Sequence, residues 1–192
     1  MSVREILLYP DRRLKQVASP AQASEFDAIA VDLIETMRSF GHCVGIAAPQ
    51  LGLMSRVVVV DVSGHPKAET SSGLLVLANP RIAERDGSKV GREGCLSLPD
   101  VTANVRRATR VVVEHAAGRV ECEGFEARCV QHELDHLDGI LFLDRVESLT
   151  DDVFRRRSYA PGPEGQSPTE RGASAPRSKS RGSAASDPER TG

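Results

Sequence analysis

The large apolar residues of this 192-residue chain stop well before its C-terminus. Beyond Tyr159 there is no Ile, Leu, Val, Met, Phe, Trp or Cys, and the remaining residues are mostly Pro, Gly, Ser, Ala and charged. Such a segment cannot bury enough apolar surface to offset the entropy that is lost when a chain becomes ordered. We therefore expect one globular domain over residues 1–157 and a disordered tail over residues 158–192.

Two long helices are predicted within residues 1–157. Apolar residues recur at three- and four-residue steps over 24–41, which is typical of a helix with one buried face. A second helix is expected over about 124–138, ended by Gly139. A last short helix is expected to begin with Thr150 as its N-cap and to end in the three arginines at 155–157, because that order of charges complements the helix dipole.

The middle of the chain is predicted to be rich in strands. A run of β-branched residues at 56–62 predicts a buried strand, and another strand is expected within 73–82. The segments 109–114 and 118–123 are predicted to pair as a hairpin.

Charge and cysteine content restrict the classes of partner. A formal net charge of −2 gives no global attraction to nucleic acid or to an anionic membrane. The N-terminal MSVREILLYPDRR lacks the apolar core of a secretory signal or membrane anchor. We therefore expect a cytoplasmic protein that binds neither DNA nor membrane. Its four cysteines, which include no CxxC pair, should be thiols.

The segment His132-Glu133-Leu134-Asp135-His136 is an HExxH motif inside the second predicted helix. Residues four apart on a helix share one face, so the two imidazoles can bind one metal ion and Glu133 can reach a water held there. Asp135 is a candidate hydrogen-bond partner for a ligand imidazole, or else a solvated helix acid. The alternative to a metal site is a pair of unrelated core histidines, each with its own hydrogen-bond partner.

A catalytic metal site needs a third protein ligand and an open fourth position. Downstream of His136 there is no further histidine, and the nearby acids fit no known extension of the HExxH motif. Upstream, Cys95 follows Gly94, which allows the backbone to approach a ligand closely. Because a thiolate with two imidazoles is a sound ligand set for a divalent transition metal, Cys95 is the third candidate.

Three segments occur in an order and at a spacing that closely resemble the signature motifs of peptide deformylases: GIAAPQ at 45–50, EGCLSLP at 93–99 and QHELDH at 131–136. The resemblance covers about residues 1–157. It implies an α+β fold with mixed, mainly antiparallel sheets around a central HExxH helix. It also implies a hydrolase that removes the N-formyl group from the N-terminal formylmethionine of newly synthesised polypeptides and releases formate.

The same resemblance implies a metal site and roles for its neighbours. Cys95, His132 and His136 would hold one Fe²⁺ ion, for which Zn²⁺, Ni²⁺ or Co²⁺ can substitute. The side-chain amide of Gln50 and the backbone N–H of Leu96 would stabilise the oxyanion. By ordinary hydrolase chemistry, Glu133 would act as general base and later pass the proton to the departing amine.

The substrate is expected to lie against both the motifs and the metal-bearing helix. The peptide beyond methionine would run extended along Val44, Gly45 and Gly94, paired through backbone groups as an added strand would be. Phe125 and Cys129 share a helical stripe with the two motif histidines and would line an apolar methionine pocket. Ordinary core packing explains Phe125 equally well and Cys129 slightly better.

One position departs from the family pattern, because Cys43 stands where the first motif usually has glycine. If Cys43 lines the cleft, it narrows the pocket or exposes an oxidisable thiol. If it faces the core, it is a small apolar filler, which we favour because free cysteine is usually buried.

Two other functions remain open at this point. An HExxH peptidase is disfavoured because the downstream third ligand is missing and EGCLSLP is present. A non-catalytic metal-binding or ribosome-docking relative would be expected to have lost Glu133 or Gln50, and neither is lost. The arginines at 155–157 and the basic residues of the tail also suggest contact with ribosomal RNA near the exit tunnel, alongside formylated nascent peptides as substrates.

Overall fold

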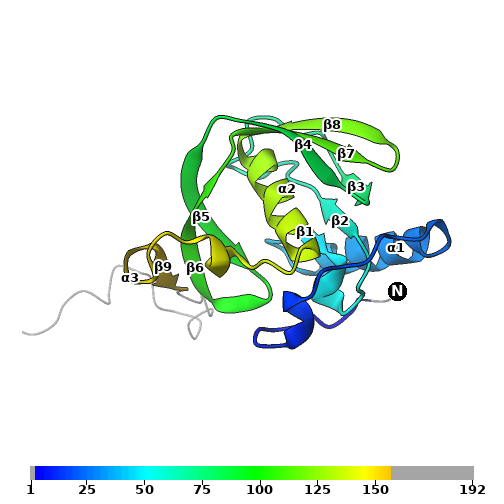
Figure 1. The fold of residues 1–192 in the computed structure, drawn as a ribbon, viewed down its shortest axis with the longest axis horizontal. Helices are drawn as coiled ribbons and strands as arrows, with labels where there is room; N and C mark the ends of the chain where they lie inside the picture. The colour runs from blue at the N-terminus through cyan, green and yellow to red at the C-terminus, as the bar shows by residue number, and fades with distance from the viewer. Residues whose placement is uncertain (1–2, 157–192) are drawn as a thin grey trace, which may run out of the picture. The chain divides into compact units, whose positions relative to one another are not determined.

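The computed structural model describes residues 3–156, which form three antiparallel sheets together with helices (Figure 1). Within this range, every pairing between named strands is antiparallel. The expected α+β class with mainly antiparallel sheets is therefore confirmed. The tail predicted over 158–192 lies outside the described residues, so the boundary between domain and tail stays a prediction.

The first sheet has the order β1 (Gly45–Ala47), β2 (Val57–Val60), β3 (Leu75–Ala78). The first predicted helix is confirmed as α1 (Ala23–Ser39), although no side chain caps its N-terminus. Side chains alternate between the two faces of a strand. Accordingly, Val57 and Val59 pack with the apolar stripe of α1, whereas Val58 and Val60 pack in the cluster that includes the second long helix. This double burial explains the unbroken valine run.

The second sheet has the order β4 (Arg81–Asp86), β7 (Arg110–His115), β8 (Gly118–Glu123). The predicted hairpin is confirmed as β7 and β8, with Val111 opposite Cys122 and His115 opposite Gly118. Both Val111 and Cys122 are buried in the main core cluster.

The third sheet has the order β5 (Lys89–Cys95), β6 (Leu98–Arg107), β9 (Val153–Arg155), so β5 is an edge strand. The prediction of a C-terminal helix that reaches the arginines at 155–157 is wrong, because the helix ends after one turn. Only α3 (Leu149–Asp152) forms, capped by Ser148, and the chain then pairs with β6 as β9. Val153 and Phe154 favour a half-buried strand, and their packing outweighs the charge order that suggested a longer helix.

The second long helix is α2 (Gly124–Leu137), and it packs against strands of the first and second sheets. It ends before Gly139, which has a φ of +68° and lies so close to the Lys15 backbone that a side chain would clash. Three short 3₁₀ segments complete the described fold: η1 (Arg12–Lys15), η2 (Ala48–Leu51) and η3 (Phe142–Arg145). Between residues 3 and 156, no helix has the length and apolar character that a bilayer crossing requires.

Candidate metal centre

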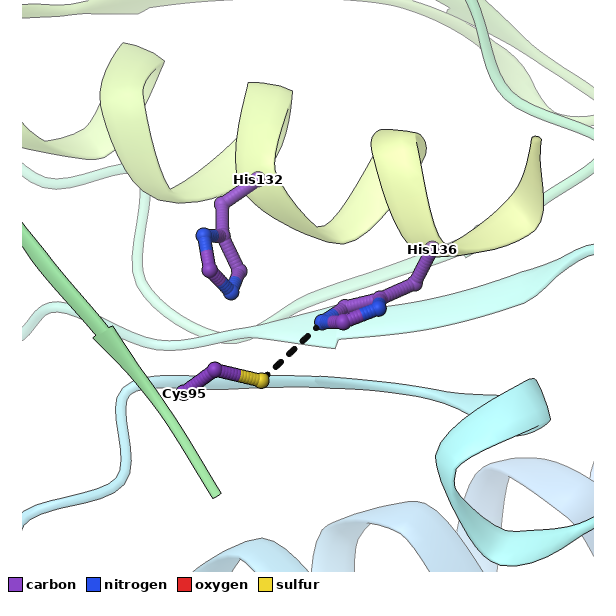
Figure 2. A group of neighbouring side chains, drawn as sticks. All are labelled: Cys95, His132 and His136. Carbon is purple, nitrogen blue, oxygen red and sulfur yellow. Dashed lines mark hydrogen bonds between the residues drawn. The ribbon is translucent and has the colours of Figure 1, made fainter. Parts of the chain in front are cut away.

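Three buried side chains converge from two elements (Figure 2). His132 and His136 project from successive turns of α2 toward Cys95, which ends β5. The Cys95 Sγ atom lies 3.3 Å from His136 Nε2, and one donor atom from each of the three residues falls within 4.8 Å of the others. The three ligands predicted from the sequence are therefore brought together.

The chemistry of this cluster suits a divalent transition-metal ion. Burial opposes ionisation of the Cys95 thiol, but His136 and His132 together hold its pKa well below the usual value. The thiolate is the form that binds metal. On His132, Nδ1 is hydrogen-bonded to Glu93 Oε2 at 3.0 Å, which leaves Nε2 for an ion, as in most protein metal sites.

Glu93 belongs to a buried network of charges behind the cluster. Arg107 donates two hydrogen bonds of 3.0 Å to the Glu93 carboxylate and a third, of 2.5 Å, to Asp135. Burial opposes ionisation of Glu93, but the hydrogen bonds with His132 and Arg107 lower its pKa to about 2. Asp135 also accepts from Arg145, at 2.7 Å. Glu93, rather than Asp135, is thus the carboxylate that orients a ligand imidazole.

The position of Glu93 could have been inferred from strand geometry. Residues two apart on a strand face the same side, so Glu93 and Cys95 point inward together while Arg92 and Gly94 are exposed. No strand was predicted for this segment, so the partner of His132 was not recognised from the sequence.

The orientation of Gln50 is fixed by its backbone neighbour. Its side-chain carbonyl accepts a 2.9 Å hydrogen bond from the Ala47 N–H. The amide nitrogen consequently faces the cluster and donates to Cys95 Sγ at 3.4 Å and to Ser97 Oγ at 3.2 Å. A buried N–H donor is therefore aimed at the same small space as the three candidate ligands.

Glu133 is buried next to β1. Burial raises the pKa of its carboxyl to about 7, against the opposing effect of His132 and His136. Within residues 3–156, its Oε2 atom has no hydrogen-bond partner. A methyl group placed on Gly45 would lie 2.7 Å from Glu133 Oε1, so the carboxylate packs directly on the backbone of the first motif.

A pocket of about 240 Å³ opens beside the cluster. Its lining includes every substrate-contacting residue predicted from the sequence, namely Val44, Gly45, Gly94, Phe125 and Cys129. The predicted catalytic residues Gln50, Leu96 and Glu133 line it too, as do Cys95 and His132. The pocket has seven further lining residues that were not predicted from the sequence, namely His42, His65, Lys67, Arg92, Glu93, Arg128 and Arg156.

Cys43 lines the same pocket and also packs against the α1 cluster. It is half-buried, and its Sγ donates to the Gly45 carbonyl at 3.0 Å. Burial raises the pKa of this thiol to about 12, so it stays protonated at neutral pH. Cys43 thus packs in the core, as favoured from the sequence, and also forms part of the pocket wall.

Two sheet edges meet at the pocket. Gly45 lies in β1 and Gly94 in β5, and each strand is at the edge of its own sheet. An edge strand offers unpaired backbone N–H and C=O groups that an extended chain can use. The geometry can therefore hold a peptide backbone beside a metal ion, a buried carboxylate and an amide donor.

Comparison with known proteins points to one family. The family described as "Polypeptide deformylase" matches residues 3–152. The chain is 42% identical over 164 residues to a peptide deformylase of Alkalilimnicola ehrlichii, covering 82% of this chain and 89% of that one. It is 39% identical to the peptide deformylase of Thermodesulfovibrio yellowstonii, covering 82% of this chain and 97% of that one.

Solved structures agree with the sequence relatives. A Met-Ala-Ser-bound class I type b peptide deformylase from Acinetobacter baumannii has a TM-score of 0.68 and 38% identity, covering 76% of this chain and 100% of that one. The peptide deformylase of Thermotoga maritima has a TM-score of 0.67 and 34% identity, covering 77% of this chain and 100% of that one.

Proposed function

The chain belongs to the polypeptide deformylase family, whose members are hydrolases that remove the N-formyl group from nascent polypeptides. From that premise we propose which of its own residues bind the metal and the substrate and which carry out the hydrolysis. The convergence of Cys95, His132 and His136 carries the proposal. We propose that these three side chains hold one Fe²⁺ ion, for which Zn²⁺, Ni²⁺ or Co²⁺ can substitute, because a thiolate and two imidazoles suit all four metals.

The bound ion would supply a Lewis acid and make water a nucleophile near neutral pH. Glu133 would take a proton from the attacking water and later deliver it to the departing amine nitrogen. Its burial next to the ligands, with one carboxylate oxygen lacking any partner among the described residues, supports this role. No side chain needs to act as a nucleophile.

Gln50 and Leu96 would stabilise the negative charge that develops on the formyl oxygen. The Gln50 amide cannot turn away without breaking the hydrogen bond from Ala47, so its N–H donor is oriented before the substrate arrives. Leu96 follows Cys95 directly and lines the pocket, which supports the use of its backbone N–H.

The substrate backbone would pair with the edges of β1 and β5 at Val44, Gly45 and Gly94. Cys129 lies about one turn and Phe125 about two turns before His132 on α2, and they would contact the methionine side chain. Backbone pairing reads no side chains, which suits an enzyme that acts on many different nascent chains.

Because its substrates are newly made polypeptides, we propose that the enzyme works in the cytoplasm and visits the ribosome exit region. The basic residues at 155–157 and within the tail sequence support an electrostatic contact with ribosomal RNA. Deleting residues 155–192 is expected to weaken cosedimentation with ribosomes at low salt. Ribosome binding that is unchanged by this deletion would contradict the proposed contact.

The function is tested by formate release from formyl-Met-Ala-Ser. Protein purified without oxygen and loaded with iron should release formate. Chelation should stop the reaction, and Fe²⁺, Zn²⁺, Ni²⁺ or Co²⁺ should bind again with one ion per chain. A folded protein that binds one ion and releases no formate would argue for a non-catalytic relative.

The contact between Gly45 and Glu133 yields a separate prediction. In Gly45→Ala, the new methyl group would lie 2.7 Å from Glu133 Oε1 and must displace the carboxylate. We expect kcat/KM to fall by about 10²-fold, since a catalytic group misplaced by about 1 Å loses that much. Gly41→Ala is the matched control, because a methyl group there meets no atom within 4 Å. Equal kcat/KM values for the two variants would contradict the role of Glu133.

A further inference from the structure

Three exposed cations line the pocket mouth: Lys67, Arg92 and Arg156, together called the basic rim. Among residues 3–156, none of the three has a carboxylate within ion-pair distance. The Arg92 guanidinium instead lies 3.4 Å from the centre of the Phe154 ring, and Lys67 Nζ lies 5.8 Å from that of Phe125. Their charge is therefore available to a ligand.

Within the described part of the chain, no acid of the pocket wall is paired with these charges. The carboxylates that line the pocket are Glu93 and Glu133, and both are buried. Glu93 is already matched by Arg107 and by Arg128, whose Nη1 lies 2.8 Å from Glu93 Oε1. The mouth of the pocket therefore presents a positive potential to an approaching peptide.

Two cations of the basic rim lie over one face of the sheet, beside the place where the peptide backbone would pair. Arg92 and Gly94 share the exposed face of β5. A methyl group on Gly94 would lie 3.3 Å from Arg156 Nη2, so that guanidinium is beside Gly94 as well. Arg92 also donates a hydrogen bond of 3.2 Å to Thr102 Oγ1, so both guanidiniums lie over the same face of the third sheet. The side chains that a paired peptide turns toward that face would lie near them.

The hollow continues beyond the pocket. A second cavity, of about 740 Å³, shares Lys67, Arg92, Phe125 and Arg128 with the first. Its lining holds five cationic side chains against three carboxylates, those of Glu69, Asp86 and Glu123, so its net charge is also positive. Two members of the basic rim thus stand at the junction of the two spaces. A peptide longer than its first residue has room to run past them.

We propose that the basic rim makes this enzyme prefer formylated chains with Asp or Glu at the two residues after formylmethionine. The inference rests on the proposed function and its substrate path. A carboxylate at these positions would meet Arg92, Arg156 or Lys67 at the surface, whereas a lysine would be repelled. Exposed charge pairs change an equilibrium by roughly two- to fivefold each, so a glutamate peptide should exceed a lysine peptide by about tenfold in kcat/KM.

The experiment uses the full chain loaded with iron and three peptides, formyl-Met-Xaa-Xaa-Ala-amide with Glu, Gln or Lys at both Xaa positions. Amidation removes the C-terminal carboxylate, so the side chains carry the only variable charge. The readout is the ratio of kcat/KM for the Glu and Lys peptides. Lys67→Gln, Arg92→Gln and Arg156→Gln should each lower the ratio about two- to threefold, and the triple variant should bring it close to one. Arg38→Gln, an exposed arginine of α1 outside the pocket, is the matched control and should leave the ratio unchanged.

Salt provides a second test, because surface charge pairs are screened. The wild-type ratio should fall toward one at about 0.5 M salt. Equal kcat/KM values for the Glu and Lys peptides at low salt, or a ratio unaffected by the triple variant, would overturn the inference while leaving deformylation intact. Variants of the basic rim that weaken ribosomal RNA binding but leave the Glu-to-Lys ratio of kcat/KM unchanged would overturn the proposed peptide preference. They would indicate instead that the rim binds nucleic acid. No formate from any peptide would instead contradict the proposed function itself.

Discussion

Glu133→Gln is expected to lower kcat for formate release by about 10²- to 10⁴-fold while the metal content stays at one ion per chain. The glutamine is the same size and keeps the contact with Gly45, but it cannot accept a proton. Since Glu133 is not among the three converging donor residues, the metal site should survive the change. The measurements are pre-steady-state formate release and metal analysis of the same preparation.

Glu147→Gln is a suitable control for this substitution. Glu147 is an exposed acid whose ion-pair partner, Arg106, is also exposed, and it lies outside the pocket. It should keep wild-type kcat. If Glu133→Gln kept wild-type kcat as well, another group would have to move the proton. If it lost both kcat and metal, Glu133 would instead support the metal site.

The sequence predicted the candidate ligands because helical spacing fixes them locally. Four residues separate His132 from His136, and any α-helix brings such a pair to one face. Cys95 could be added only through the chemistry of metal ligands and the resemblance to known motifs. No periodicity relates residue 95 to residue 132, so their meeting depends on how β5 packs against α2.

The third sheet shows why other elements were missed. β5 has a charged residue or glycine at five of its seven positions, and β6 includes Pro99, Asp100 and Asn104, which are residue types depleted in strands. Their inward-facing residues include Glu93 and Arg107, which are buried only because they neutralise each other. The alternation of apolar and polar residues in the sequence predicts that such charged residues lie on the surface. The buried pairing was therefore hidden from the sequence.

The pocket mouth was hidden for a different reason. His65 lies in the loop between β2 and β3, and its ring stacks on Phe125 with the centroids 4.3 Å apart. Lys67 and Arg156 come from a loop and from the residue after β9, two segments far apart in the sequence. Long-range placement of loops follows from the packed fold and not from local propensity.

Arg107→Met is expected to lower the melting temperature by about 10 °C. Arg107 is buried and bridges the Glu93 and Asp135 carboxylates. Burial lowers the pKa of its guanidinium, but the two acids outweigh this effect and hold the pKa above the usual value. Methionine fills a similar volume but leaves both buried carboxylates short of a positive partner. Removing one member of a buried ion pair costs roughly 3–5 kcal/mol, and each kcal/mol moves the melting temperature by about 2–4 °C in a domain of this size.

The neighbouring residue supplies the control. Arg106 lies on the same strand and pairs with Glu147 at 2.9 Å, but the two side chains are 54% and 67% exposed. Because solvent screens such a pair, Arg106→Met should move the melting temperature by less than about 4 °C. Comparing the two variants by calorimetry separates the loss of an arginine from the loss of a buried one.

The same substitution should also weaken the metal site. Glu93 orients the His132 ring, and without Arg107 its remaining ion-pair partners among residues 3–156 are Arg128 and His132. Loss of such support for a ligand typically costs about 10- to 100-fold in metal affinity, which competition with a chelator would measure at a temperature where Arg107→Met is still folded. A variant that melts early but binds metal as tightly as wild type would mean that the network stabilises the fold alone. Weaker metal binding would mean that Arg107 acts on the ion through Glu93 and His132. The same arginine would then link the stability of the fold to the geometry of the metal centre.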